Sequence, residues 1–156
     1  QGRNRRPPKD PVNAALSLLY TLLYGAGVEA SVERGLDAGI GYLHEPAPGR
    51  ASLACDLMEP LRPKADEVVV SLFRQRVLRK EHFQERDGGC LMGKAGRRAF
   101  YEGVEPGMEK LRKQIRKLAG VVAKAADAAG RGESLEIENE DETTVHRGSA
   151  RDESEG

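Results

Sequence analysis

The stretch DPVNAALSLLYTLLY, residues 10–24, decides the fold. Asp10 followed by Pro11 predicts the start of a helix, because an N-cap carboxylate accepts free backbone N–H groups and proline has a helical φ at the first position. The leucines that follow point in several directions on a helix, which indicates burial on most of its sides. Gly25 and Gly27 then predict the end of this helix.

The helical pattern continues beyond this stretch. A short helix is predicted for residues 28–34, ended by Gly35 through the usual preference for glycine after a helix. A longer helix is predicted for about residues 53–77, with Ser52 as its cap. It contains two prolines that bend it or remove backbone hydrogen bonds, Pro60 and Pro63.

The later part of the chain predicts one more long helix. Residues 80–96 have the pattern of a loop or a weak hairpin around Asp87-Gly88-Gly89, and about residues 97–129 that of a helix with a break at Pro106-Gly107. No repeat and no alternation of strands with helices is visible. We therefore expect an all-α domain over residues 1–130.

Charge divides the chain into two parts. Residues 1–130 hold 22 Lys/Arg against 16 Asp/Glu, a net of +6, whereas residues 131–156 hold 3 against 9, a net of −6. The second part is acidic and poor in large apolar residues, which predicts a disordered tail. The basic part is compatible with a polyanion such as DNA, because neutralising phosphates releases counterions. A solvated surface of mixed charge is the alternative.

Composition argues against several other classes. Aromatic residues make up 4% of the chain and Trp is absent, so base stacking is not expected as a main binding device. Cys55 and Cys90 are far apart, which indicates neither a zinc site nor a disulfide framework and favours a reducing cytoplasm. The apolar run over residues 14–26 is short and interrupted by polar side chains, so we expect no membrane span.

The chemistry-bearing residues gather between positions 44 and 62. Asp56 and Glu59 are three residues apart on a predicted helix, so their side chains share one face, and Arg62 continues the same row. His44 precedes them across a short loop. One nitrogen and several oxygens suit Mn²⁺ or Mg²⁺. A capped histidine, a solvated acidic face, or an ion pair of Arg62 with either carboxylate would fit the same spacing.

Three ordered blocks of sequence resemble a known family. RRPPKDPVNAALS, residues 5–17, is similar to RRPPxDPVNALLS, and residues 35–45, GLDAGIGYLHE, are similar to GLDPxxGxLHE. Residues 53–63, LACDLMEPLRP, resemble LALDLMEPFRP. These patterns are typical of the CRISPR-associated adaptation integrase, the metal-dependent DNA endonuclease of spacer acquisition. The resemblance extends over about the first 100 residues, and its departures are Ala38, Cys55 and Leu61.

The resemblance implies a multi-helix catalytic domain and a divalent-metal site. His44 and Glu59 match two catalytic ligands for Mn²⁺ or Mg²⁺, and Asp56 matches a supporting acidic position. The family's third ligand, a Glu in a Gly-x-Glu-Gly segment, and its N-terminal β-rich domain both precede the RRPP block. We expect both to lie upstream of residue 1, and we expect little or no catalysis by these 156 residues alone.

The resemblance also implies partners. Spacer fragments, the CRISPR repeat and branched DNA are the expected DNA partners, contacted through Arg3, Arg5, Arg6, Lys9 and Arg62. For the first four of these residues, a role in surface solubility is the alternative. Asn13 and Tyr20 lie on the first helix where they can face the same cleft, with helix packing as the alternative and favoured for Tyr20. A homodimer, a small ferredoxin-like CRISPR-associated partner and a prokaryotic cytoplasm are implied. A non-catalytic helical remnant that binds DNA or protein is the alternative function.

Overall fold

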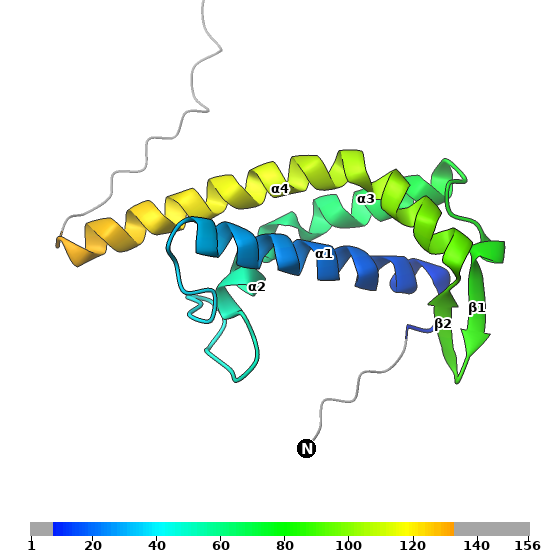
Figure 1. Ribbon diagram of the computed structural model, residues 1–156, viewed down its shortest axis with the longest axis horizontal. Helices are drawn as coiled ribbons and strands as arrows, with labels where there is room; N and C mark the ends of the chain where they lie inside the picture. Colours follow the sequence, from blue (N-terminus) through cyan, green and yellow to red (C-terminus); the bar gives the residue numbers. More distant parts are fainter. Residues whose placement is uncertain (1–7, 133–156) are drawn as a thin grey trace, which may run out of the picture.

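Helix α1, Pro11–Glu33, runs through the middle of the computed structural model, which describes residues 8–132. The other helices pack around it (Figure 1). In chain order they are α2, Ser52–Met58; the 3₁₀ turn η1, Glu59–Leu61; α3, Arg62–Arg74; the 3₁₀ turn η2, Lys80–His82; and α4, Lys94–Gly130. The all-α prediction is confirmed as a mostly helical fold with one small hairpin.

The start of α1 is as predicted, but its end is not. Asp10 is the N-cap, and its carboxylate accepts the backbone N–H of Asn13 at 2.9 Å. The predictions of a helix end at Gly25 and Gly27, and of a separate helix over residues 28–34, were wrong. Gly27 is needed for close packing, because a Cβ there would lie 3.0 Å from the Cβ of Ala54 on α2.

Helix α1 ends at Glu33 with Arg34 as its C-cap, and Gly35 follows the cap, as the glycine rule predicted for residues 28–34. Gly35 has φ +69°, and the backbone N–H groups of Gly35 and Leu36 donate to the carbonyls of Val32 and Ser31, each at 2.9 Å. This is the Schellman arrangement, in which a left-handed residue satisfies the last carbonyls of a helix.

The single helix predicted over residues 53–77 is in fact three pieces. Pro60 lies in η1, and Pro63 lies in the first turn of α3, where a missing backbone N–H costs little. The bend expected from the prolines is therefore present, while the continuous helix was wrong. The prediction of Ser52 as a cap was wrong too: Ala51 is the N-cap of α2, and the Ser52 hydroxyl donates to the carbonyl of Glu45.

The hairpin considered for residues 80–96 is present. Strands β1, Phe83–Arg86, and β2, Gly89–Met92, pair antiparallel and are joined by Asp87 and Gly88. Both turn residues have positive φ, +53° and +72°, as a two-residue hairpin turn requires. The hairpin packs beside the start of α1, since the backbone N–H of Cys90 donates to the carbonyl of Pro8 at 2.6 Å.

Helix α4 runs unbroken through Pro106, so the predicted break at Pro106-Gly107 was wrong. Pro106 is exposed, and a buried row continues on both sides of it: Phe100, Val104, Met108, Leu111, Ile115 and Ala119. Gly107 lets α4 approach α3 closely, because a Cβ at this position would lie 2.7 Å from a methyl group of Val68. Burial along the row holds the helix together where proline removes one hydrogen bond.

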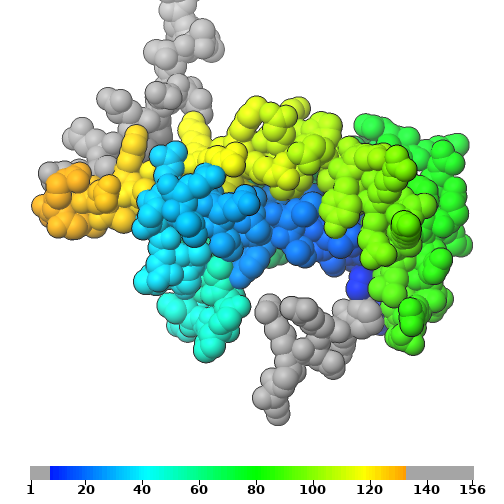
Figure 2. Space-filling model, viewed as in Figure 1, coloured from blue at the N-terminus to red at the C-terminus, as the bar shows by residue number. Residues whose placement is uncertain are grey.

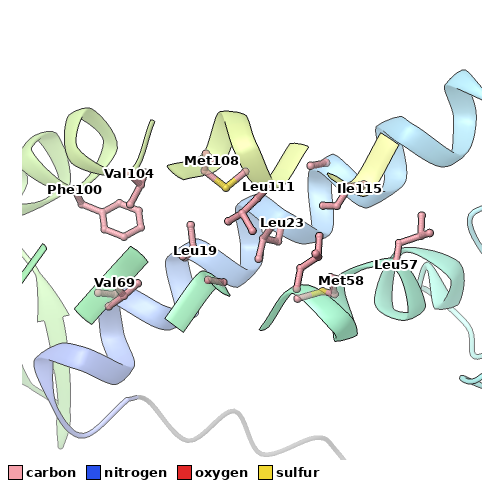
Figure 3. Packing of buried hydrophobic residues seen from close by; sticks show 14 of the residues in the cluster. Leu19, Leu23, Leu57, Met58, Val69, Phe100, Val104, Met108, Leu111 and Ile115 are labelled. Carbon is pink, nitrogen blue, oxygen red and sulfur yellow. The ribbon is translucent and has the colours of Figure 1, made fainter. Parts of the chain in front are cut away.

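One hydrophobic core joins the four helices (Figure 3). Leu19 and Leu23 of α1 are fully buried, and Leu57 of α2, Val69 of α3 and Phe100 of α4 meet them in the same cluster. By length and composition alone, the 23-residue α1 is apolar enough to cross a membrane. In this fold its inner row lies against three other helices, an arrangement that a core helix also has.

The acidic tail and the first basic residues lie outside the described part of the chain. Helix α4 ends at Gly130, and the predicted domain boundary after this residue stays a prediction. Disorder of residues 131–156 stays a prediction.

Two glycines of α1 provide a test of this packing. Gly25→Ala is expected to raise the free energy of unfolding by about 0.5–1 kcal/mol, because alanine favours a helix and no atom lies within 4 Å of the added methyl. Gly27→Ala is expected to lower it by about 1–3 kcal/mol, because backbone atoms of Ala54 lie 3.1 Å from the added methyl. Urea unfolding followed by circular dichroism measures both. Equal stabilisation by the two changes would show that α1 and α2 do not pack as described.

Candidate functional site

A buried carboxylate organises the site. Asp56, in the second turn of α2, is 1% exposed and accepts four hydrogen bonds from a single loop segment. Its Oδ2 accepts the backbone N–H groups of Tyr42 and Leu43 at 2.7 and 3.0 Å. Its Oδ1 accepts the backbone N–H of His44 at 3.1 Å and lies 2.5 Å from His44 Nδ1. The segment Tyr42–His44 is thereby fixed onto α2 by one side chain.

This contact determines which nitrogen of His44 is free. An ionised carboxylate only accepts hydrogen bonds, so Nδ1 carries a proton, and in the neutral imidazole Nε2 is then the nitrogen with the free lone pair. The His44 side chain is 33% exposed. A carboxylate behind a histidine is the arrangement that orients metal-binding imidazoles and raises their basicity.

Gly41 is required by the same contact. A Cβ at this position would lie 2.7 Å from Asp56 Oδ2, 2.7 Å from the carbonyl oxygen of His44 and 2.9 Å from the Cβ of Ser52. These distances leave no room for a methyl group. The glycine in the GYLHE block is therefore explained by the close approach of the backbone to Asp56.

The rest of the loop is held from the other side. The Ser52 hydroxyl donates to the carbonyl of Glu45 at 3.0 Å, and the side chain of Arg50 donates to that carbonyl as well. The backbone N–H of Ala51 donates to the hydroxyl of Tyr24 on α1 at 2.7 Å. These anchoring contacts were not expected from the sequence. Arg50 and Ser52 lie 5 and 7 positions after Glu45, whereas Tyr24 lies 27 positions before Ala51.

Hydrogen bonds and burial act in opposite directions on the Asp56 carboxylate. Burial alone would raise its pKa, but the hydrogen bonds from the His44 side chain and from the backbone of residues 42–44 outweigh burial. The pKa of Asp56 therefore lies below 3.8, the ordinary value for aspartate. The group stays ionised at neutral pH.

Glu59 lies one helical turn after Asp56 and forms a different contact. Its Oε1 forms an ion pair with the Arg62 guanidinium at 3.0 Å, and the side chains of Glu59 and Arg62 are 37% and 45% exposed. The Arg62 guanidinium also lies over the ring of Tyr20, 5.1 Å from its centroid. The Glu59–Arg62 ion pair was one of the structural alternatives for this spacing.

Tyr20 belongs to the same network. Its hydroxyl donates to Asp66 of α3 at 2.5 Å. Burial, followed by the hydrogen bond to and the charge of Asp66, raises the pKa of Tyr20 to about 12, so the phenol keeps its proton. The packing role favoured for Tyr20 therefore includes a specific contact between α1 and α3.

The structure separates the remaining predicted residues from this site. Asn13 bonds Asp10 at the start of α1, its side chain donating at 2.6 Å. It lies 11 residues before Tyr24, or about 16 Å along a helix. Lys9 is exposed near the hairpin, where it lines a shallow hollow with Lys80 and Phe83. Arg3, Arg5 and Arg6 lie outside the described residues.

A hollow lies between α1 and α2 beside this network. It measures about 490 Å³ and includes Tyr20, Tyr24, Arg50 and Cys55 in its lining. In Figure 2, α1 is visible between two projecting parts, the loop with α2 on one side and the hairpin on the other. The guanidinium group of Arg50 and the phenol rings of Tyr20 and Tyr24 line this hollow, so its surface is partly polar and partly aromatic.

The donor set suits a divalent cation only in part. His44 Nε2 and the Glu59 carboxylate are one nitrogen and one oxygen donor of the kinds that Mn²⁺ binds. Within residues 8–132, no group of three or more His, Cys, Asp or Glu side chains is placed to hold a metal ion. Such a cation would therefore take its other ligands from water, substrate or another segment. The predicted pairing of His44 with Glu59 on one metal stays a prediction.

The Asp56 contact predicts a pH dependence of stability. A carboxylate whose pKa is lowered by folding stabilises the fold above its unfolded pKa, near 3.8, and loses this effect as pH falls through the folded pKa. The free energy of unfolding of the wild type is therefore expected to fall below about pH 4, and Asp56→Asn should lack this component. At neutral pH Asp56→Asn should be less stable by on the order of 3–5 kcal/mol, since an NH2 group replaces one acceptor oxygen and faces buried N–H donors.

Urea unfolding between pH 2.5 and pH 7 measures both effects, with Asp87→Asn in the exposed hairpin turn as the control. The control should follow the wild-type curve. Parallel pH curves for the wild type and Asp56→Asn would show that the Asp56 carboxylate is not the group that fixes the loop.

Comparison with known proteins identifies relatives of the chain. A family model described as CRISPR associated protein Cas1 matches residues 1–106. The CRISPR-associated endonuclease Cas1 2 of Rhodospirillum rubrum is 52% identical over 93 residues, which are 59% of this chain and 27% of that protein. The CRISPR-associated endonuclease Cas1 1 of Thermodesulfovibrio yellowstonii is 48% identical over 101 residues, 64% of this chain and 32% of that protein.

Solved structures agree with these relatives. A Cas1 protein from Thermotoga maritima superposes with a TM-score of 0.74 at 28% identity, over 90% of this chain and 45% of that one. A casposase bound to an integration product gives a TM-score of 0.66 at 25% identity, over 79% and 40%. The Cas1-containing partial Cas6-RT-Cas1–Cas2 complex gives 0.72 at 26% identity, over 83% and 42%.

The chain thus spans about a third or less of the length of these two curated relatives. The family model covers more than half of the chain, and the fold agrees with that of a solved Cas1. The chain belongs to the Cas1 family of CRISPR-associated proteins.

Proposed function

We propose that this chain supplies the helical part of the catalytic centre of a metal-dependent DNA endonuclease and integrase, which inserts short DNA spacers into a CRISPR array. The observation that carries the proposal is the contact of His44 Nδ1 with Asp56, which attaches the histidine to α2 through a residue one helical turn before Glu59. The relatives named as Cas1 endonucleases and the casposase bound to an integration product support it.

In this proposal each residue has a distinct role. His44 Nε2 and a Glu59 oxygen hold Mn²⁺ or Mg²⁺, which when bound polarises a phosphodiester and stabilises the charge of an in-line displacement. Asp56 keeps the imidazole in the tautomer that leaves Nε2 unprotonated and fixes its orientation. Loop residues 42–44 cannot shift without losing three backbone hydrogen bonds to Asp56.

The proposed partners follow from the charges and from the neighbouring structures. Arg3, Arg5, Arg6, Lys9 and Arg62 would contact the phosphates of spacer, repeat or branched DNA. Two structural neighbours are Cas1–Cas2 complexes, which supports a CRISPR-associated partner. A small ferredoxin-like partner, a homodimer as the working unit and a prokaryotic cytoplasm are proposed from the family resemblance alone. The third carboxylate ligand would come from a segment preceding those described.

One observation favours the alternative, a non-catalytic module that binds DNA or protein. The carboxylate of Glu59 is already paired with Arg62, so it is not presented as a free ligand. The following experiment separates the two functions.

His44→Ala and Glu59→Ala are expected to abolish Mn²⁺-dependent strand transfer. The assay uses a chimera in which this chain replaces the matching segment of the Rhodospirillum rubrum relative, so that the preceding part is supplied. Each change removes one of the two proposed metal donors, and the rate should fall to that of the reaction without protein. Incorporation of a labelled spacer into a repeat-containing plasmid measures the rate.

His82→Ala and Glu67→Ala are the matched controls. They replace a histidine and a glutamate, the same residue types as in the test variants, at positions outside the site. Both controls should retain activity, with unchanged circular dichroism in all four variants. Strand transfer by His44→Ala or Glu59→Ala at the control rate would remove that residue from the site and favour the non-catalytic module.

DNA binding by the 156-residue chain is expected to weaken steeply with salt, because binding releases counterions from phosphates. Fluorescence anisotropy of a labelled branched DNA between 50 and 300 mM KCl, at about neutral pH, gives the slope of log K against log salt. Replacing Arg3, Arg5, Arg6 and Lys9 with Gln should make the slope shallower by about one unit per residue. A slope that is flat in the wild type would contradict a phosphate-binding surface.

A further inference from the structure

The Glu59–Arg62 pair is more firmly held than its exposure suggests. Arg62 contacts the Glu59 carboxylate at 3.0 Å and lies over the Tyr20 ring at 5.1 Å from the centroid. The ring itself is fixed, because the Tyr20 hydroxyl donates to Asp66 at 2.5 Å. One guanidinium is therefore placed by a carboxylate on one side and by an aromatic face from another helix.

This arrangement places a positive charge where a metal ligand is expected. The guanidinium lies at Oε1, one of the two oxygens that a cation could use, and two cations close to one carboxylate repel each other. A divalent ion at Glu59 would therefore compete with Arg62 and displace it from that oxygen. The displaced guanidinium would then be free to accept a different anion, and a DNA phosphate is the anion that the proposed reaction brings.

We propose that Arg62 is an internal competitor of the divalent cation for Glu59, and that the ring of Tyr20 holds it in that position. This inference rests on the proposed function, since it concerns the same cation. It makes Arg62 and Tyr20 positioning residues that set the metal affinity of the site. It also couples the two ligands: cation binding releases Arg62 for phosphate, so cation and DNA should strengthen each other's binding.

The expected effect is modest. An exposed ion pair contributes little to a fold, and losing one such competitor is expected to tighten cation binding about two- to fivefold. The change in Tyr20 is the sharper test, because it alters the position of Arg62 without altering the net charge of the chain. An effect of total charge alone would leave that variant unchanged.

The experiment measures free Mn²⁺ by electron paramagnetic resonance during titration of the chimera with the Rhodospirillum rubrum relative, which supplies the preceding segment, at low ionic strength. Arg62→Gln and Tyr20→Leu are each expected to bind Mn²⁺ two- to fivefold more tightly than the wild type. This range corresponds to the interaction energy of an exposed ion pair. Arg98→Gln is the matched control, because Arg98 also pairs with a glutamate, at 2.9 Å, near the hairpin end of α4. Its affinity should equal that of the wild type.

The outcomes separate this inference from the proposed function. Loss of binding in His44→Ala, together with unchanged or weaker binding in Arg62→Gln, would overturn the competition and leave the metal site standing. Tighter binding in Arg62→Gln without any change in a folded Tyr20→Leu would assign the effect to charge alone and overturn the positioning. Equal Mn²⁺ binding in His44→Ala and the wild type, or none in any variant, would overturn both.

Discussion

The structure depends on how a single buried carboxylate is satisfied. Asp56 lies 1% exposed at the interface of α2 with its preceding loop, where an unpaired charge would be costly. The loop supplies what the carboxylate requires, three backbone N–H groups and one imidazole N–H. The backbone groups are satisfied in the same contact. The carboxylate needs donors and the backbone N–H groups of the loop need an acceptor, so each satisfies the other. This explains why an irregular segment holds one histidine in a defined orientation.

The two acidic residues of the site differ in burial, and their spacing in the sequence did not predict this difference. Asp56 and Glu59 are three residues apart, and both side chains were predicted on one helix face. In the fold Asp56 faces the loop, whereas Glu59 lies where α2 passes into a 3₁₀ turn and its side chain is 37% exposed. One carboxylate thereby becomes a support and the other a candidate ligand. The division depends on where the loop passes, which no periodicity in the sequence indicates.

Local signals predicted the parts of the fold that local physics determines. The Asp-Pro start of α1, the glycine at its end and the Asp-Gly hairpin turn depend on a few neighbouring residues, and each is present. The predictions at Gly27 and Pro106 were wrong because glycine and proline occur both at the ends of helices and inside them. Only the contact with Ala54, and the buried row on both sides of Pro106, decides between a helix end and a helix interior. The Tyr20–Asp66 bond spans 46 positions, so the network around Arg62 was not predictable either.

Proline at position 106 also gives α4 an uneven stiffness. The helix has 37 residues and is about 55 Å long. One backbone hydrogen bond is missing from it, because Pro106 has no N–H to donate to the carbonyl of Glu102. Both residues are exposed, so water can donate a hydrogen bond to this carbonyl. A bend in the rod costs least at this point. The close contact of Gly107 with Val68 of α3 opposes such a bend, so α4 is held straight by packing at the position where its own hydrogen bonds are weakest.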